Sequence, residues 1–177
     1  MKTPWGTSQL VKEVAPGIQE VSTGSHGGYK LDRKRNAQVP EVFRRPGGWY
    51  EEDCEAAIVI LTFPEVFKVG ADMARQTLRE YYPDEYTAAF GEAVDLKDSW
   101  ILRERSALEA AKGKLIVMAA WGDWNPGVPS GMVGVVARVD GKQPPDRWFL
   151  VPAGEYTKEN RMCFVINPDR HKEVERF

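Results

Sequence analysis

The chain has 177 residues, 42% of them hydrophobic and 28% charged, which suits a compact globular protein with a proper core. Its 16 glycines, 12 prolines and 2 cysteines exclude a collagen-like or disulfide-framework protein. Its 24 basic and 26 acidic side chains give a net charge of −2, which does not favour direct binding to nucleic acid. We expect one globular domain spanning residues 1–177, with a less regular segment around 24–53.

The first residues lack the apolar run of a secretory signal, and the longest apolar stretch, residues 115–121, is far shorter than the roughly 20 residues of a membrane span. We therefore expect a cytoplasmic protein that makes no use of a membrane. No metal-ligand spacing or phosphate-loop motif is present, so we expect no cofactor and no metal.

The first part of the chain predicts mainly strands. Residues 10–14 and 18–21 flank a Pro-Gly turn and predict a hairpin, and residues 29–31 predict a third strand. Asp32 is placed to cap a short helical turn over residues 33–36. Residues 56–63 are apolar except for Thr62 and rich in β-branched side chains, which predicts a central strand.

Helices are predicted next, followed by strands. Apolar residues at helical spacing predict helices over 72–82 and 98–112, with a short helix between them that ends at Gly91. Strands are predicted over 115–120, 132–139, 147–151 and 162–166, with Asp140-Gly141 as a turn. This order indicates an α+β fold, with a mainly antiparallel sheet and about three helices packed on one face.

The most site-like stretch is the glycine-rich bend Gly24–Tyr29. Its glycines let the backbone approach a ligand, while hydroxyls and an imidazole supply donors and acceptors. The candidate binding residues here are Ser25, His26, Gly27 and Tyr29. The alternative is a simple bend between strands with an exposed His26.

A second stretch places two aromatic rings before three acids. The candidate binding residues are Trp49, Tyr50, Glu51, Glu52 and Asp53. Paired carboxylates can act as acid and base or hold a divalent ion, but the sequence does not place the second ligand group that an ion needs. The alternative is a solvated acidic edge whose Trp49 packs on the core.

A third stretch, around Trp121, Asp123 and Trp124, follows a predicted strand. The two tryptophans can clamp a planar group or a partner side chain. The alternative is a turn in which Asp123 bonds its own backbone. Because all three stretches lie at strand ends, we expect them to converge on one surface.

Several specific segments together resemble an uncharacterised domain family of proteobacterial plasmids, integrated elements and phages. The resemblance spans about residues 3–171. It implies a mobile-element context but no particular reaction. Small proteins of such elements often block restriction or CRISPR machinery. The segments that carry it are Thr3–Gly6, Val21–Thr23 with Ser25–Gly28, Arg35–Pro40, Gly48–Cys54, Phe63–Pro64 and Trp121–Trp124.

Charge is distributed unevenly, because residues 51–109 hold 14 acidic and 6 basic side chains, a net charge of −8. With the resemblance, this favours a protein-binding accessory that inhibits a nucleic-acid-processing host defence complex, as anti-CRISPR or anti-restriction proteins do. The sequence is compatible with a homo-oligomer. The alternative is a small hydrolase or transferase using His26 with Glu52 or Asp53, in a pocket lined by Trp121 and Trp124. No catalytic residue is assigned, and a non-enzymatic role is favoured.

Overall fold

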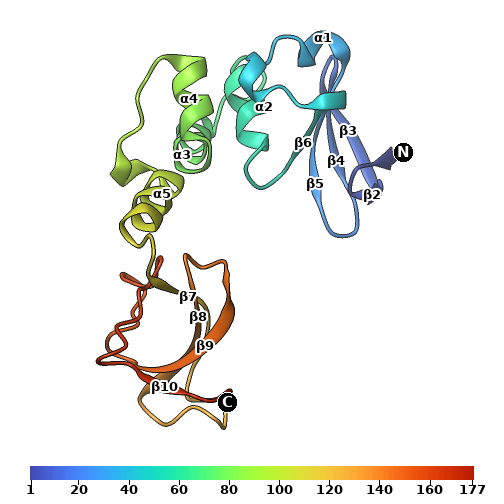
Figure 1. Ribbon diagram of the computed structural model, residues 1–177. Helices are drawn as coiled ribbons and strands as arrows, with labels where there is room; N and C mark the ends of the chain where they lie inside the picture. Colours follow the sequence, from blue (N-terminus) through green and yellow to red (C-terminus); the bar gives the residue numbers. More distant parts are fainter. The chain divides into compact units, whose positions relative to one another are not determined.

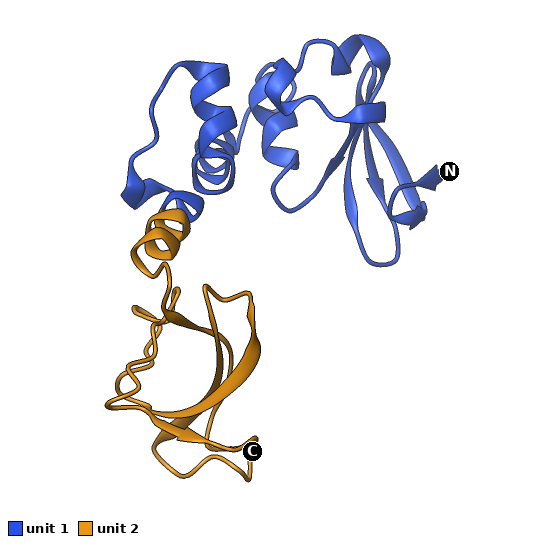
Figure 2. Cartoon of the chain, in the orientation of Figure 1, with its two compact units in different colours: residues 1–102 blue, residues 103–177 orange.

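The computed structural model describes residues 1–177, and they divide into two compact units, residues 1–102 and residues 103–177 (Figure 2). The fold is α+β, with antiparallel sheets and five α-helices. No helix has the length and apolar character required to span a membrane. The expectation that residues 1–177 form one globular domain stays a prediction.

Unit 1 begins with a small ribbon, β1 (Lys2–Thr3) and β2 (Gly6–Thr7), followed by a four-stranded antiparallel sheet in the order β3-β4-β5-β6 (Figure 1). The predicted hairpin is confirmed, since β3 pairs with β4 around a turn in which Gly17 has a φ of 80°. The predicted third strand is also confirmed. The strands are β3 (Leu10–Ala15), β4 (Ile18–Ser22), β5 (Gly27–Leu31) and β6 (Trp49–Glu51).

The chain between β5 and β6 is short and irregular. Helix α1 (Arg33–Asn36) begins as predicted at Asp32, whose carboxylate accepts a hydrogen bond of 2.7 Å from the Arg35 amide. Two 3₁₀ turns follow, η1 (Glu41–Phe43) and η2 (Pro46–Gly48). This segment returns the chain to the sheet, so that β6 becomes its edge strand.

The predicted strand over residues 56–63 is wrong, because Ala56–Thr62 form helix α2. A central strand needs a pairing partner on each side, and the sheet ends at β6, which spans only Trp49–Glu51. A helix satisfies its backbone hydrogen bonds internally and still buries Ile58 and Val59. A short, continuously apolar run does not by itself distinguish the two structures.

The three predicted helices are confirmed in type and approximate position. They are α3 (Ala71–Tyr81), α4 (Pro83–Phe90) and α5 (Trp100–Ala110), with a 3₁₀ turn, η3 (Leu96–Asp98), before the last. Gly91 ends α4 in the left-handed conformation. The core of unit 1 joins sheet and helices through buried residues that include Ile18, Leu31, Tyr50, Ile58, Leu78 and Tyr86.

Unit 2 contains a second antiparallel sheet in the order β10-β9-β8-β7 (Figure 1). Three predicted strands are confirmed, and the turn at Asp140 and Gly141 has both residues at positive φ. The buried core includes Leu115, Val135, Phe149 and Val151. The strands are β7 (Leu115–Trp121), β8 (Met132–Val139), β9 (Gln143–Pro152) and β10 (Lys172–Val174).

The predicted strand over residues 162–166 is wrong. This segment lies beside β7 without continuous strand pairing. Val165 forms an isolated bridge with Ile116, and the Ile166 amide donates to the Leu115 carbonyl at 2.9 Å. Cys163 has a φ of 50°, a left-handed conformation that a continuous strand does not allow. The pairing is therefore interrupted, although Ile166 is still buried.

Candidate functional site

Strand pairing brings two of the three predicted site segments together in unit 1. In the β5–β6 pair, Gly28 lies opposite Glu51 and Tyr29 lies opposite Tyr50. The pairing continues past the strand, because the Glu52 amide donates to the Gly27 carbonyl at 3.0 Å. The glycine-rich bend and the acidic stretch therefore share one corner of the sheet.

A hydrogen-bonded turn presents His26 at this corner. The Thr23 hydroxyl donates to the His26 carbonyl at 2.9 Å and accepts from the His26 amide at 3.1 Å. The neighbouring Ser25 is exposed, and its amide also points to the Thr23 hydroxyl, at 3.4 Å. The imidazole is held at the surface by its backbone, not by packing of the ring.

His26, Glu51 and Glu52 form a cluster of titratable side chains in unit 1, which we call the His26 corner. His26 Nδ1 lies 3.5 Å from Glu51 Oε1, and the three residues offer ligand atoms that all lie within 4.8 Å of one another. The His26 side chain is 53% exposed and that of Glu51 is 25% exposed. Such a group can exchange protons or bind a cation.

The three acids of this stretch differ in their surroundings. Glu51 Oε2 accepts a hydrogen bond of 2.9 Å from the Asp53 amide, which fixes the Glu51 carboxylate. Glu52 is exposed and makes no hydrogen bond or ion pair through its side chain, and Asp53 is exposed as well. Glu55, a little further on, is paired instead with Arg45 at 2.6 Å. The acids at the corner thus have no Lys or Arg partner.

Two glycines make this geometry possible. A Cβ atom on Gly27 would lie 2.5 Å from Glu52 Oε2, so the missing side chain leaves room for that carboxylate. Gly28 has a φ of 152°, and a Cβ there would lie 2.1 Å from the Tyr50 carbonyl oxygen. The glycines therefore serve close packing of β5 against β6 and the Glu52 carboxylate.

A cavity of about 310 Å³ lies beside the corner, between β4, β5 and α2. Its apolar wall includes Leu10, Ala56 and Ile60, and its carboxylates are Glu20 and Glu52. His26 does not line it. The enzyme interpretation requires an imidazole facing a pocket, whereas the titratable acids of this cavity are the Glu20 and Glu52 carboxylates and no imidazole lines it.

The aromatic residues predicted for this site have structural contacts. Trp49 packs edge-on against Trp5 at 5.6 Å, with the Lys30 ammonium 5.0 Å from its ring. Tyr50 is fully buried, and its hydroxyl donates to Asn36 at 2.6 Å. Burial raises the pKa of Tyr50, so the phenol stays protonated as a hydrogen-bond donor.

Tyr29 is half-buried and packs edge-on against Phe67 at 5.2 Å. Burial, together with the nearby Glu20 carboxylate, raises the pKa of Tyr29. This ring lines the cavity and is available to anything that enters it.

The third predicted segment belongs to unit 2. Trp121 stacks on Trp148 at 5.5 Å with an interplanar angle of 22°, and Phe177 meets both rings edge-on. Asp123 accepts a hydrogen bond of 3.1 Å from the Gly131 amide, which fixes the loop. Trp124 is 75% exposed and is the one ring of the segment free to meet a partner. Convergence of this segment with the other two stays a prediction.

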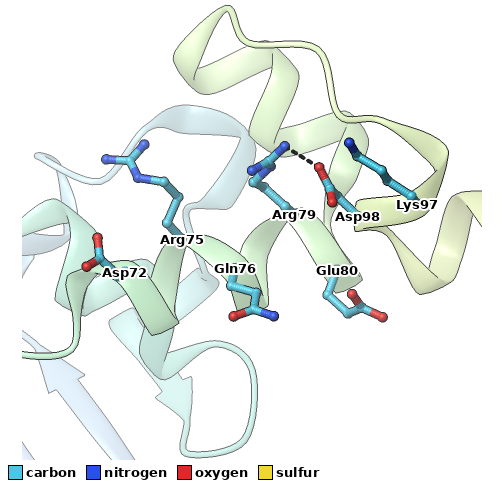
Figure 3. A pocket seen from close by; sticks show the side chains of 7 residues that line it. All are labelled: Asp72, Arg75, Gln76, Arg79, Glu80, Lys97 and Asp98. Atoms are coloured by element: carbon cyan, nitrogen blue, oxygen red, sulfur yellow. Dashed lines mark hydrogen bonds and ion pairs between the residues drawn. The ribbon is translucent and has the colours of Figure 1, made fainter.

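Sequence reasoning missed a charged groove of about 370 Å³ along α3 (Figure 3). Arg79 Nη2 bonds Asp98 at 2.8 Å, and Arg75 Nη1 donates to the Tyr86 hydroxyl at 2.9 Å. The signal in the sequence is the spacing of Arg75 and Arg79, which places both on one helix face. Its charges balance, with three cations and three carboxylates among Asp72, Arg75, Gln76, Arg79, Glu80, Lys97 and Asp98.

A family model described as a domain of unknown function (DUF7007) matches residues 1–112. No curated protein and no solved structure matches the chain. The match includes all of unit 1, and hence the His26 corner.

Proposed function

Because the chain belongs to the DUF7007 family of domains of unknown function, we propose from its surface chemistry that it is a binding protein of a mobile genetic element. In this proposal it acts in the bacterial cytoplasm by occupying a surface of a host defence complex that processes nucleic acid. Anti-CRISPR and anti-restriction activity are the forms such inhibition takes. The plasmid and phage context comes from the resemblance of its sequence segments.

The observation that carries this proposal is the run of carboxylates Glu51–Asp53, at and next to the His26 corner, which has no Lys or Arg partner. Glu52 and Asp53 are exposed without a Lys or Arg beside them, whereas nearby Glu55 is neutralised by Arg45. Proteins that bind nucleic acid carry Lys and Arg in the channel that holds the phosphates. Unpaired carboxylates can compete with phosphate for those side chains, and they raise the association rate with a cationic surface.

Exposed aromatic side chains supply the second element of a protein-binding surface. Trp124 in unit 2 and Tyr81 in unit 1 are 75% and 47% exposed. Large aromatic residues of this kind contribute most of the energy at many interfaces, because they lose little conformational entropy on burial. Either ring can anchor a partner once the acidic surface has attracted it.

The hydrolase or transferase alternative rests on one observation, the closeness of His26 Nδ1 to Glu51 at 3.5 Å. That distance exceeds an ordinary hydrogen bond, and the imidazole is half exposed and outside the cavity. The carboxylate beside it is Glu51, whereas the sequence favoured Glu52 or Asp53. Binding without turnover is therefore the better account.

The experiment is a pull-down from host lysate with the wild-type chain and a Glu51→Lys/Glu52→Lys/Asp53→Lys variant. We expect the wild type to retain a nucleic-acid-processing complex and the variant to lose it. Inhibition of that complex should be stoichiometric and should weaken as salt is raised, because the attraction is electrostatic.

A matched control reverses three exposed carboxylates outside the acidic stretch, as Glu13→Lys/Glu41→Lys/Glu175→Lys. It changes the net charge of the chain by the same amount, so it should retain the complex if the location of the charge matters. Equal recovery with all three proteins, or inhibition with multiple turnovers per chain, contradicts the proposal.

A further inference from the structure

The His26 corner has the composition of a metal site. We propose that His26, Glu51 and Glu52 bind a divalent transition-metal ion of the zinc type. One imidazole nitrogen and two carboxylate oxygens come from two adjacent segments that backbone pairing holds together. The sequence offered paired carboxylates without a further ligand, and the fold supplies that ligand as His26.

The distances fit such an ion. Zinc holds nitrogen and oxygen ligands at about 2.0–2.1 Å, so two ligand atoms of a tetrahedral site lie roughly 3.3 Å apart. His26 Nδ1 and Glu51 Oε1 are already 3.5 Å apart. Glu52 is exposed and lies within 4.8 Å of both, so a rotation of its side chain completes the set.

Electrostatics also favour a cation here. Glu51 and Glu52 bring two carboxylates close together, where their charges repel each other. Elsewhere in the same segment the fold places an arginine against the carboxylate, as at Arg45 and Glu55. At the corner, His26 is the only titratable base, and a divalent ion bound to it offsets the charge of both acids.

The backbone leaves space for the third ligand. Gly27 lies directly under the Glu52 carboxylate, and a Cβ there would lie 2.5 Å from Glu52 Oε2. Any larger residue would have to displace the Glu52 carboxylate. The absence of a side chain at position 27 therefore leaves space for a proposed ligand as well as for strand pairing.

The ligand set also indicates which class of ion binds. Imidazole suits zinc, cobalt and nickel, whereas magnesium and calcium prefer oxygen ligands alone. Three protein ligands leave a fourth position open for water or a ligand atom. The cavity of about 310 Å³ that Glu52 lines gives such a ligand room next to the ion.

The test is isothermal titration of Zn²⁺ into the full chain after removal of metal with a chelator, with Co²⁺ absorption as a geometric probe. We expect one ion per chain and a Co²⁺ spectrum of a four-coordinate nitrogen and oxygen site. His26→Ala, Glu51→Gln and Glu52→Gln should each weaken binding at least 10-fold, the size of loss that even an outer-shell change produces. Mg²⁺ should not compete.

Two matched controls separate this site from its surroundings. Asp53→Asn removes an adjacent acid that lies outside the ligand set, and Cys54→Ser removes the nearest thiol; each should change affinity less than roughly twofold. Loss of binding in Cys54→Ser, unchanged binding in His26→Ala, or no binding by the wild type overturns the site. Circular dichroism of each variant excludes unfolding as the cause.

Metal binding and the proposed partner interaction can fail separately. A pull-down repeated in chelator reports on the partner without the ion, whereas the titration needs no partner. A bound cation lowers the negative charge of the corner, so added Zn²⁺ should weaken capture of the complex if both proposals hold.

Discussion

Each unit of the protein contains one histidine beside one glutamate, and the two pairs differ in almost everything except distance. His26 lies 3.5 Å from Glu51 in unit 1, and His171 lies 3.3 Å from Glu155 in unit 2. The His26 side chain is 53% exposed, whereas that of His171 is 3% exposed. The same two residue types therefore lie in different surroundings in the two units.

In the buried pair, every polar atom of the imidazole has a partner. His171 Nδ1 accepts a hydrogen bond of 3.1 Å from the Asn167 amide, so Nε2 carries the proton that faces Glu155. Arg170 neutralises that glutamate at 2.6 Å, and the ring stacks on Phe164. A histidine so completely bonded is structural, whereas His26 keeps a nitrogen available. A ring nitrogen without a partner, more than a short distance to a carboxylate, therefore distinguishes a candidate site from a structural contact.

The largest expected effect is on the buried pair. His171→Ala should lower the free energy of unfolding by about 2–4 kcal/mol, because it leaves a cavity beside Phe164 and removes the acceptor of the Asn167 amide. Urea unfolding followed by circular dichroism measures the loss. A change below about 0.5 kcal/mol would falsify the structural role.

The same variant tests whether the chain is one cooperative domain. If residues 1–177 unfold together, hydrogen exchange of the Tyr50 and Leu78 amides in unit 1 should accelerate in His171→Ala. If only amides of unit 2 accelerate, the units unfold independently and the single-domain prediction is wrong.

A smaller effect on stability is expected from a substitution of Gly27, next to the exposed pair. Gly27→Ala places a Cβ atom against Glu52 Oε2 at 2.5 Å and against the Val21 carbonyl at 3.2 Å. Glu52 can move away, so the stability loss should be about 1 kcal/mol or less. Thermal unfolding measures that loss and zinc titration measures the ligand geometry. Unchanged zinc affinity would contradict the role proposed for Gly27 in leaving space for the Glu52 ligand.

His26→Ala should have almost no effect on stability. The ring is half exposed and the turn is held through the His26 backbone, so we expect a change within about 0.5 kcal/mol. Urea unfolding beside His171→Ala gives the direct comparison. A loss as large as that of His171→Ala would mean that both pairs are structural, and the His26 corner would then lose its functional interpretation.

Local chemistry explains which parts of the fold could be predicted. The Pro-Gly hairpin, the Asp32 cap and the stop at Gly91 depend on nearest neighbours, and all three are confirmed. The helix over residues 56–62 depends on whether a sheet has an open edge for another strand, which no short segment contains. The break at Cys163 is likewise a local conformation that its sequence does not signal.

The sequence singles out His26, Glu51 and Glu52 as candidate residues, but it does not predict their arrangement. The proposed acid and base pair used Glu52 or Asp53, whereas the nearest carboxylate to the imidazole is Glu51. Which acid faces His26 depends on the β5–β6 register, a contact between residues more than twenty positions apart. The sequence suggests Tyr50 as a candidate binding residue, but the alternation of side chains along β6 directs its ring into the core.

The smallest expected effect concerns the free thiols, one in each unit. Burial, followed by the charges of Asp53, Glu51 and Glu55, raises the pKa of Cys54, whereas burial and Glu104 raise that of Cys163. A raised pKa leaves less thiolate at a given pH, so both thiols should react with iodoacetamide more slowly than a free thiol near pH 8, and faster as pH rises.

Asp53→Asn removes one repelling charge from the surroundings of Cys54 only. It should accelerate alkylation of Cys54 by roughly twofold and leave Cys163 unchanged, as measured by mass spectrometry of the two peptides. Equal acceleration at both sites would mean that the Asp53 charge does not act locally on the Cys54 thiol.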